Sequence, residues 1–229
     1  MKGYGQFCPV AKAAEIFAER WTPILLRDLL KGPRRFSELH AGAPRMSQSV
    51  LAQRLKSLER QGIVARRPNP VGKGSEYFLT AAGEEFGEAV ERLGEWGMRH
   101  SIDKLRPDDL DPGFLMWAIE GHMHLDALPE RRVVVQVDFR GRPNEHWWLV
   151  LERPNVELCQ EDHGFEPDVF VLADLRAMTE VYLGRRRLTQ AVEAGLVEID
   201  GPRWLVRAFP TWIGVSTFAR YGQAAAGLL

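Results

Sequence analysis

The segment from Ser47 to Thr80 constrains the fold of this 229-residue chain most strongly, because it joins a helical pattern directly to a hairpin pattern. Its first part predicts an amphipathic helix that is capped by Ser47 and ends at Gly62. The apolar positions of this helix are Leu51, Leu55 and Leu58. Two strand-like runs follow, residues 63–67 and 76–80, around a turn rich in proline and glycine at residues 68–74. The segment therefore predicts a small α+β unit.

Shorter helical segments precede this unit. We expect a helix over residues 9–18, a second from Pro23 to the stop at Gly32-Pro33, and a short helix or turn over residues 36–39. The predicted apolar stripe of the second helix is Ile24, Leu25, Leu29 and Leu30. Three helices followed by a basic-tipped hairpin describe a winged helix-turn-helix, whose recognition helix enters the major groove of DNA. A small α+β domain with an ordinary mixed-charge surface is the alternative.

The charge of the chain is divided unevenly between its halves. The formal net charge is -1, yet residues 1–100 hold 16 basic and 11 acidic side chains, whereas residues 101–229 hold 14 and 20. The first half thus carries +5 and the second -6. This asymmetry predicts two domains, which we place at 1–100 and 101–229, and it directs only the first toward a polyanion.

One face of the helix that follows Ser47 is polar and basic. At about 100° per residue, the side chains opposite the leucines are Ser49, Gln53, Lys56 and Arg60. There is no acidic side chain among them, so this face suits the base edges and phosphates of DNA.

Several short motifs lie along residues 7–97. They are Cys8-Pro9, Trp21, the block from Gly32 to Leu39, Ser47-Gln48, Leu51, Arg54-Leu55, Leu58-Glu59, Gly62-Ile63-Val64 and the run from Glu76 to Thr80. With these motifs the first half resembles the HxlR family of bacterial winged-helix transcription regulators. The resemblance implies dimerisation through helices that flank the winged motif, and residues 84–100 form such a predicted helix. Its apolar stripe is Phe86, Val90, Leu93 and Gly97, with Trp96 beside it.

The same resemblance implies DNA contacts at particular residues. The base-reading candidates are Arg45, Gln48, Ser49, Gln53, Arg54 and Lys56. The phosphate-contact candidates are Arg34, Arg35, Arg66, Arg67 and Lys73. Glutamine can form paired hydrogen bonds with adenine, and arginine with guanine. Arg54 lies nearer the leucine face, so an ion pair with Glu38 or Glu59 is its alternative role.

The two cysteines, Cys8 and Cys159, lie far apart in sequence, which argues against a disulfide scaffold and favours a reducing cytoplasm. Cys8 precedes a helix whose dipole can lower the pKa of a thiol. Some members of the resembled family sense electrophiles or oxidants through a cysteine at this point. A regulator switched through Cys8 is therefore an alternative function, and packing in the helix-entry turn is the alternative role of the residue.

The second half predicts a five-stranded sheet with helices. After a link at residues 106–113 we expect a helix over residues 114–127, with Leu115, Ile119 and Met123 along one side. The expected strands are residues 132–140, 144–152 and 155–162, which form an antiparallel meander, then 168–173 and 196–201. The expected helices are residues 175–183, capped by Asp174, and 187–194, and the remainder reads as helical and apolar.

The end of this half carries a recognisable order of pieces: Asp174-Leu175, a helix, Leu183-Gly184, a helix with Ala191 and Gly195, a strand, and Gly201. With this spacing, residues 110–215 resemble the sterol carrier protein type 2 lipid-binding fold. The resemblance implies a small mixed sheet with helices over an apolar cavity. It further implies fatty acyl or sterol-like ligands and no cofactor.

Aromatic and sulfur-containing side chains are the candidates for an effector pocket in this half: Trp117, Met123, Trp147, Trp148, Trp204 and Trp212. The alternative is that large aromatic side chains fill a small core. Trp147 and Trp148 are neighbours in a predicted strand, so they point to opposite faces and at most one lines a cavity.

No metal site, catalytic constellation or membrane segment is expected. On a helix the imidazoles of His122 and His124 diverge, which disfavours zinc, and no nucleophile triad or phosphate loop is recognisable. No run reaches the roughly 18 apolar residues of a membrane span, and the N-terminus lacks a secretory apolar region. We therefore expect a cytoplasmic, homodimeric, non-enzymatic regulator that binds operator DNA and an apolar or amphipathic effector. A lipid carrier or enzyme with a vestigial DNA-binding half is the remaining alternative.

Overall fold

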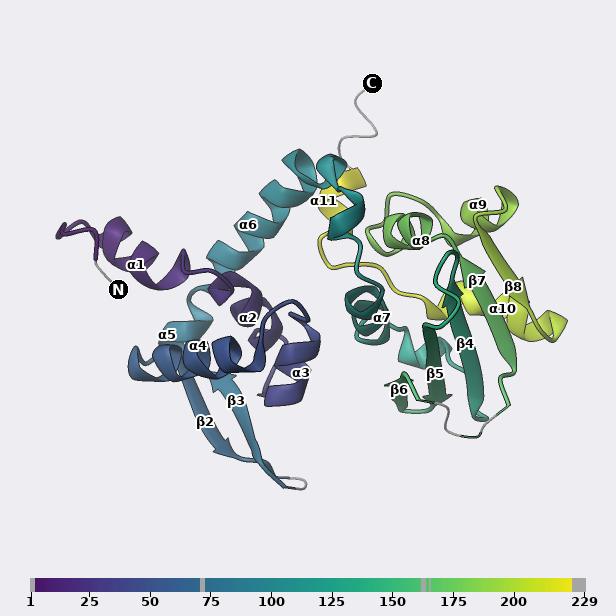
Figure 1. Ribbon diagram of the computed structural model, residues 1–229, viewed down its shortest axis with the longest axis horizontal. Coiled ribbons are helices and arrows are strands. Elements are labelled where there is room, and N and C mark those ends of the chain that lie inside the picture. Colours follow the sequence, from purple (N-terminus) through teal and green to yellow (C-terminus); the bar gives the residue numbers. More distant parts are fainter. Residues whose placement is uncertain (1–2, 71–72, 162–163, 165, 224–229) are drawn as a thin grey trace. The chain divides into compact units, whose positions relative to one another are not determined.

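The computed structural model describes residues 3–70, 73–161, 164 and 166–223 (Figure 1). The chain forms two compact units, Met1–Gly94 and Glu95–Leu229. Each unit has a buried apolar cluster of its own, so each is described separately.

The first unit combines helices with a small antiparallel sheet. Its helices are α1 (Pro9–Phe17), α2 (Thr22–Leu29), α3 (Phe36–Ala41), α4 (Gln48–Arg60), α5 (Ala81–Glu84) and the start of α6 (Gly87–His100). Its strands are β1 (Arg34–Arg35), β2 (Val64–Pro68) and β3 (Ser75–Leu79), in the order β1-β3-β2. Figure 1 shows β2 and β3 extending away from the helices, which is the arrangement of a winged helix-turn-helix.

The helix and hairpin predicted from Ser47 to Thr80 are confirmed. The Ser47 hydroxyl caps the start of α4 by accepting a hydrogen bond from the Val50 N–H at 3.3 Å. Gly62, at φ 72°, ends the turn that follows the helix. The three leucines of α4 are buried in the core of the unit. Val71 and Gly72, in the predicted turn, lie outside the described residues.

The first unit differs from the expectations in three details. Leu30 was expected in the apolar stripe of α2, but it is 40% exposed and Leu26 is fully buried instead. The two-residue strand β1 was not expected at all, and it pairs with β3 opposite Tyr77 and Glu76. The helix expected over residues 84–100 begins at Gly87, as α6, and ends at His100 as expected, and the short helix α5 before it was not expected.

Glu85 and Phe86 form the turn between α5 and α6, and the start of α5 is fixed to the hairpin. The Thr80 hydroxyl donates to the Gly62 carbonyl at 2.6 Å and accepts from the Gly83 N–H at 3.2 Å, which ties α5 to the start of the hairpin. Gly83 packs on the Ile63 carbonyl so closely that a Cβ there would lie 2.2 Å from the oxygen. Gly83 therefore has no room for a side chain at this contact.

The second unit is built on a five-stranded sheet, as expected. The strands are β4 (Val133–Phe139), β5 (His146–Glu152), β6 (Asn155–Cys159), β7 (Val169–Ala173) and β8 (Val197–Asp200), in the order β6-β5-β4-β7-β8. The antiparallel meander of β4, β5 and β6 is confirmed, whereas β7 runs parallel to β4. β6 ends at Cys159, and residue 162, its expected end, lies outside the described residues.

Helices bury one face of this sheet. They are α7 (Pro112–Glu120), α8 (Leu175–Tyr182), α9 (Leu188–Glu193) and α10 (Arg203–Trp212), and α11 (Ala219–Gln223) follows them. Alternate residues of β4, from Val133 to Phe139, join side chains of these four helices in one core. On the other face Phe170 and Leu172 of β7 are 45% and 39% exposed. The sheet is thus covered by these helices on one side.

The expected cap of α8 is confirmed, because Asp174 Oδ1 accepts a hydrogen bond from the Ala177 N–H at 2.8 Å.

The helix expected over residues 114–127 ends early, at Glu120. After Gly121 the chain is held by α10, because the His124 N–H donates to the Trp212 carbonyl at 2.9 Å. Leu125–Ala127 forms only a short 3-10 turn, η3. Two further 3-10 turns, η1 (Ile102–Lys104) and η2 (Pro107–Asp109), precede α7. The stretch after α10 was expected to be helical, yet residues 213–216 form no helix, and residues 224–229 lie outside the described residues.

Candidate nucleic-acid interface

The outer face of α4 presents the polar side chains that the sequence placed there. Leu51, Leu55 and Leu58 are each at most 1% exposed and fix the orientation of the helix. The exposed residues of this region include Arg45, Gln48, Ser49, Gln53 and Lys56. The Ser49 hydroxyl lies 3.1 Å from that of Ser47, so it also takes part in the start of the helix. The face can meet both phosphates and base edges.

Arg54 differs from these residues. Its Nη2 donates to Glu19 Oε2 at 2.7 Å, and the two side chains are only 17% and 23% exposed. The expected ion pair therefore exists, but its partner is Glu19 from the segment between α1 and α2, and not Glu38 or Glu59. The Nε of Arg54 is buried and has no hydrogen-bond partner among the described residues.

The hairpin adds basic side chains beside this helix. Arg66, Arg67 and Lys73 are exposed on β2 and at the described edge of the wing tip. Arg67 Nε donates to Glu76 Oε1 across the hairpin at 2.5 Å, and its guanidinium stacks 5.0 Å from the centre of the Phe78 ring. Arg34 and Arg35 form β1, where they pair with β3, and Arg35 is exposed. The small sheet therefore holds four of the five phosphate-contact candidates.

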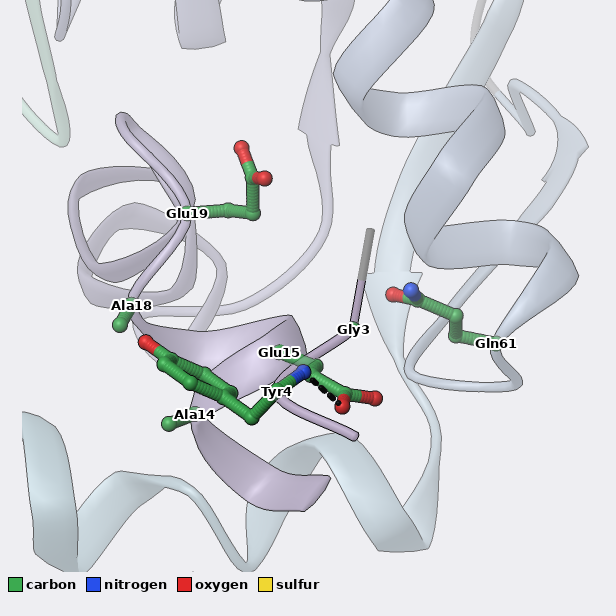
Figure 2. Close-up of a pocket in the computed structure, with 7 residues that line it drawn as sticks. All are labelled: Gly3, Tyr4, Ala14, Glu15, Ala18, Glu19 and Gln61. Atoms are coloured by element: carbon green, nitrogen blue, oxygen red, sulfur yellow. Dashed lines mark hydrogen bonds between the residues drawn. The ribbon is translucent and has the colours of Figure 1, made fainter. Parts of the chain in front are cut away.

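A pocket of about 470 Å³ lies beside α1 (Figure 2). It is lined by Gly3, Tyr4, Ala14, Glu15, Ala18, Glu19 and Gln61. The Tyr4 N–H donates to Glu15 Oε1 at 3.0 Å, drawn as a dashed line in Figure 2. Lys12 pairs with the same carboxylate at 2.9 Å and, with this hydrogen bond, lowers the pKa of Glu15. The two carboxylates of this pocket are each paired with a cation, Glu15 with Lys12 and Glu19 with Arg54.

The two cysteines occupy different surroundings. Cys8 is half-buried and immediately precedes α1, and its side chain makes no capping hydrogen bond. Cys159 is 6% exposed at the end of β6. Burial raises the pKa of the Cys159 thiol, and the nearby carboxylates of Glu157 and Glu120 raise it further. A raised pKa and burial both disfavour the reactive thiolate form of Cys159.

The effector candidates are distributed over several places in the second unit. Met123, Trp147 and Trp212 are 7%, 6% and 1% exposed and belong to the core. Trp147 and Trp148 point to opposite faces of β5, as expected. Trp117 and Trp148 are half-buried, whereas Trp204 is 51% exposed beneath the Arg131 guanidinium, 5.3 Å from its ring centre.

Sequence reasoning missed a pocket of about 260 Å³ in the second unit. It lies between the segment that precedes α7 and the outer face of α8, and none of the six effector candidates lines it. Its only sequence signal is the helical spacing of Arg176, Thr179, Glu180 and Leu183, which is also the pattern of an ordinary solvated helix face.

His122 and His124 lie after α7, not on a helix as expected. The Nδ1 of His122 lies 2.8 Å from the Ala118 carbonyl oxygen, and that of His124 lies 3.1 Å from the Thr211 carbonyl oxygen. Among the described residues, histidine, cysteine and carboxylate side chains form no group of three suited to a metal ion. In the same part of the chain, no helix combines the length and apolar character needed to cross a membrane.

A winged helix-turn-helix whose recognition helix exposes a polar, basic face defines a DNA-binding protein. Residues 16–104 match the HxlR-like helix-turn-helix family. The chain is 34% identical over 112 residues to the uncharacterised HTH-type transcriptional regulator YvaP of Bacillus subtilis, an alignment that covers 48% of this chain and 95% of that relative. The chain belongs to the HxlR-like helix-turn-helix family and is a DNA-binding transcription regulator.

Two solved structures are also similar to the chain. The reduced form of the transcriptional regulator YodB from Bacillus subtilis shares 30% identity, with a TM-score of 0.37, and the match covers 43% of this chain and 98% of that one. The redox regulator HypR in its oxidised form shares 31% identity, with a TM-score of 0.38, over 43% of this chain and 98% of that one. The family match ends at residue 104, before the sheet of the second unit.

Proposed function

We propose that the protein is a homodimeric operator-binding regulator that reads DNA with α4 and responds to a small molecule bound by its second unit. The observation that supports DNA reading by α4 is its exposed polar face. Three buried leucines fix which side of the helix faces outward. The similar transcription regulators are bacterial, and we propose that this protein binds DNA in the cytoplasm.

Each residue of the interface has a proposed role. Gln48 and Gln53 are suited to adenine, Arg45 to guanine, and Ser49 and Lys56 to either base edges or phosphates nearby. Arg34, Arg35, Arg66, Arg67 and Lys73 are proposed to hold phosphates, which orient the protein without reading sequence. We propose that Arg54 positions α4 through Glu19, because this ion pair already occupies its guanidinium.

Exposed apolar side chains support the proposed dimer. On the first unit Phe7, Val10 and Leu93 are 101%, 76% and 50% exposed, and Trp96 on α6 is 57% exposed. Large apolar side chains exposed on a surface are typical of regions that a partner covers. A two-fold dimer would match a two-fold operator.

The second unit supports a small-molecule response. It has a mixed five-stranded sheet with helices on one face, and the order of α8, α9, β8 and α10 is the order that the sterol carrier resemblance implies. The proposed ligand is apolar or amphipathic. Mass spectrometry of small molecules released from purified protein would identify it, and a protein that carries none and binds no lipid would contradict this part.

Base readout is tested by comparing operator and random DNA. Gln53→Ala should lose discrimination at one base pair, roughly 1–3 kcal/mol, and keep its affinity for random DNA. Gln61→Ala is the matched control, because Gln61 is exposed after the end of α4. Equal losses on both DNAs would show that Gln53 does not read a base. Failure of the wild type to prefer any sequence would instead favour a lipid carrier with a vestigial DNA-binding half.

A thiol-switched regulator is the second candidate function. A relative described as a redox regulator supports it, as does the half-buried Cys8 at the start of α1. An oxidant should then change operator affinity in the wild type and not in Cys8→Ser. If both proteins respond equally, the switch does not act through Cys8.

A further inference from the structure

The pocket in the second unit is formed by two segments that are distant in sequence. One wall comes from the linker before α7, through Ile102, Asp103, Leu105 and Leu110. The other comes from α8 and the turn after it, through Arg176, Thr179, Glu180, Leu183 and Arg185. The pocket holds about 260 Å³, which is enough for a small organic molecule.

The fold of α8 turns these polar side chains outward. Ala177, Met178 and Val181 are buried in the core and fix the inner face of the helix. Arg176, Thr179 and Glu180 therefore lie on its other side, against the linker. The Thr179 hydroxyl donates to the Leu175 carbonyl at 2.8 Å, so its oxygen is left as an acceptor and the guanidinium of Arg176 becomes the chief donor.

Both carboxylates of the pocket are already paired with an arginine other than Arg176. Arg185 pairs with Asp103, and Glu180 pairs with Arg186 at 2.9 Å. Arg176 is the remaining charged side chain of the lining, and it makes no ion pair with a carboxylate among the described residues. Its one hydrogen bond there joins Nη2 to the Leu105 carbonyl at 3.3 Å. A guanidinium has five N–H donors, so most of its capacity remains for a ligand.

We infer that this pocket binds a small organic carboxylate, held by Arg176 and packed against Leu105, Leu110 and Leu183. The inference rests on the proposed effector function and gives it a site and a ligand class. A planar guanidinium can donate two parallel hydrogen bonds to one carboxylate, which neither an alcohol nor an amine can accept in the same way. The three leucines give the ligand an apolar wall, which inorganic anions cannot use.

The test is calorimetric titration of the full-length protein with probes that differ in charge and in apolar body. Benzoate and hexanoate are the carboxylate probes, benzamide and benzylamine are the neutral and cationic counterparts of benzoate, and inorganic phosphate is the anion without an apolar body. We expect wild type to bind at least one of the carboxylates in preference to all three others.

Variants locate the binding. Arg176→Gln should raise the Kd for the carboxylate about tenfold or more. Arg176→Lys keeps the charge without the paired N–H donors, so its Kd should lie between those of wild type and Arg176→Gln. Arg207→Gln is the matched control, because Arg207 is exposed on α10 and does not line the pocket. Thermal unfolding of the unliganded variants shows whether each one is folded.

The outcomes separate this inference from the proposed function. Equal carboxylate binding by wild type and Arg176→Gln, equal binding of phosphate or of the amide, or no carboxylate binding at millimolar concentration would each overturn the inference. If a neutral lipid binds wild type and Arg176→Gln equally, the effector function stands and its site lies elsewhere. Operator binding is measured without these probes, so its loss would count only against the proposed function.

Discussion

The ion pair between Arg54 and Glu19 joins the middle of α4 to the segment between α1 and α2. Glu19→Gln should lower the free energy of unfolding by about 1–2 kcal/mol, because it leaves a largely buried guanidinium without its counter-charge. Urea unfolding measures the loss, and Glu59→Gln, on the same helix as Arg54, is the control.

If Arg54 positions α4, Arg54→Ala should weaken binding to operator and to random DNA together. A loss confined to the operator would make Arg54 a base reader.

The two thiols provide a second test at the scale of single residues. A thiol reagent at neutral pH should modify Cys8 and leave Cys159 intact, because Cys159 is 6% exposed and its pKa is raised by burial. Denaturant should then expose one further thiol. Peptide mapping after labelling measures both steps. Rapid labelling of Cys159 in the native protein would contradict the packing of β6 against its neighbours.

At the scale of elements, the start of α4 depends on one hydroxyl. Ser47→Ala removes the acceptor of the Val50 N–H and should destabilise the protein by about 1 kcal/mol. Ser57→Ala, inside the same helix, should have a smaller effect because it replaces no cap. Urea unfolding of both variants makes the comparison. Equal effects would show that the Ser47 cap contributes little to the helix.

The wing is the second element with a measurable role. Lys73 is exposed near the wing tip, so Lys73→Ala should reduce the salt dependence of DNA binding by about one phosphate, a change of roughly 0.9 in the log–log slope. Affinity should fall alike for all sequences. Lys104→Ala, in η1 of the second unit, is the control. An unchanged slope in Lys73→Ala would mean that this wing does not contact DNA.

The elements that could be predicted from sequence are those with a repeating pattern or a cap. The structure agrees with the predicted helical spacing of the leucines in α4 and with the predicted alternation of buried residues in β5. It also agrees with the predicted cap at Asp174 before α8. β1 has two residues and therefore no period to read. The early end of α7 depends on the backbone contact between His124 and Trp212, which are far apart in sequence. The pocket beside α8 was missed for the same reason, because its two walls meet only in the folded unit.

At the scale of the whole molecule, the chain joins a basic unit to an acidic one. Residues 1–100 carry a net charge of +5 and residues 101–229 a net charge of -6, so the second half should repel DNA wherever it approaches the backbone. The two halves therefore oppose each other in non-specific binding. Sequence-specific binding depends less on this opposition, because it also draws on base contacts made by α4.

A fragment of residues 1–100 tests this division, since it contains α1 to α6 and the whole small sheet. It should bind random DNA more tightly than the full chain, most clearly at low salt, where the Debye length is about 30 Å at 0.01 M. It should also lose any response of operator affinity to the carboxylate, because Arg176 and the pocket are gone, whereas a switch at Cys8 would survive. Fluorescence anisotropy of both proteins with operator and random DNA, with and without benzoate, hexanoate and an oxidant, measures all three effects. A fragment that keeps its carboxylate response would contradict an effector site in the second unit.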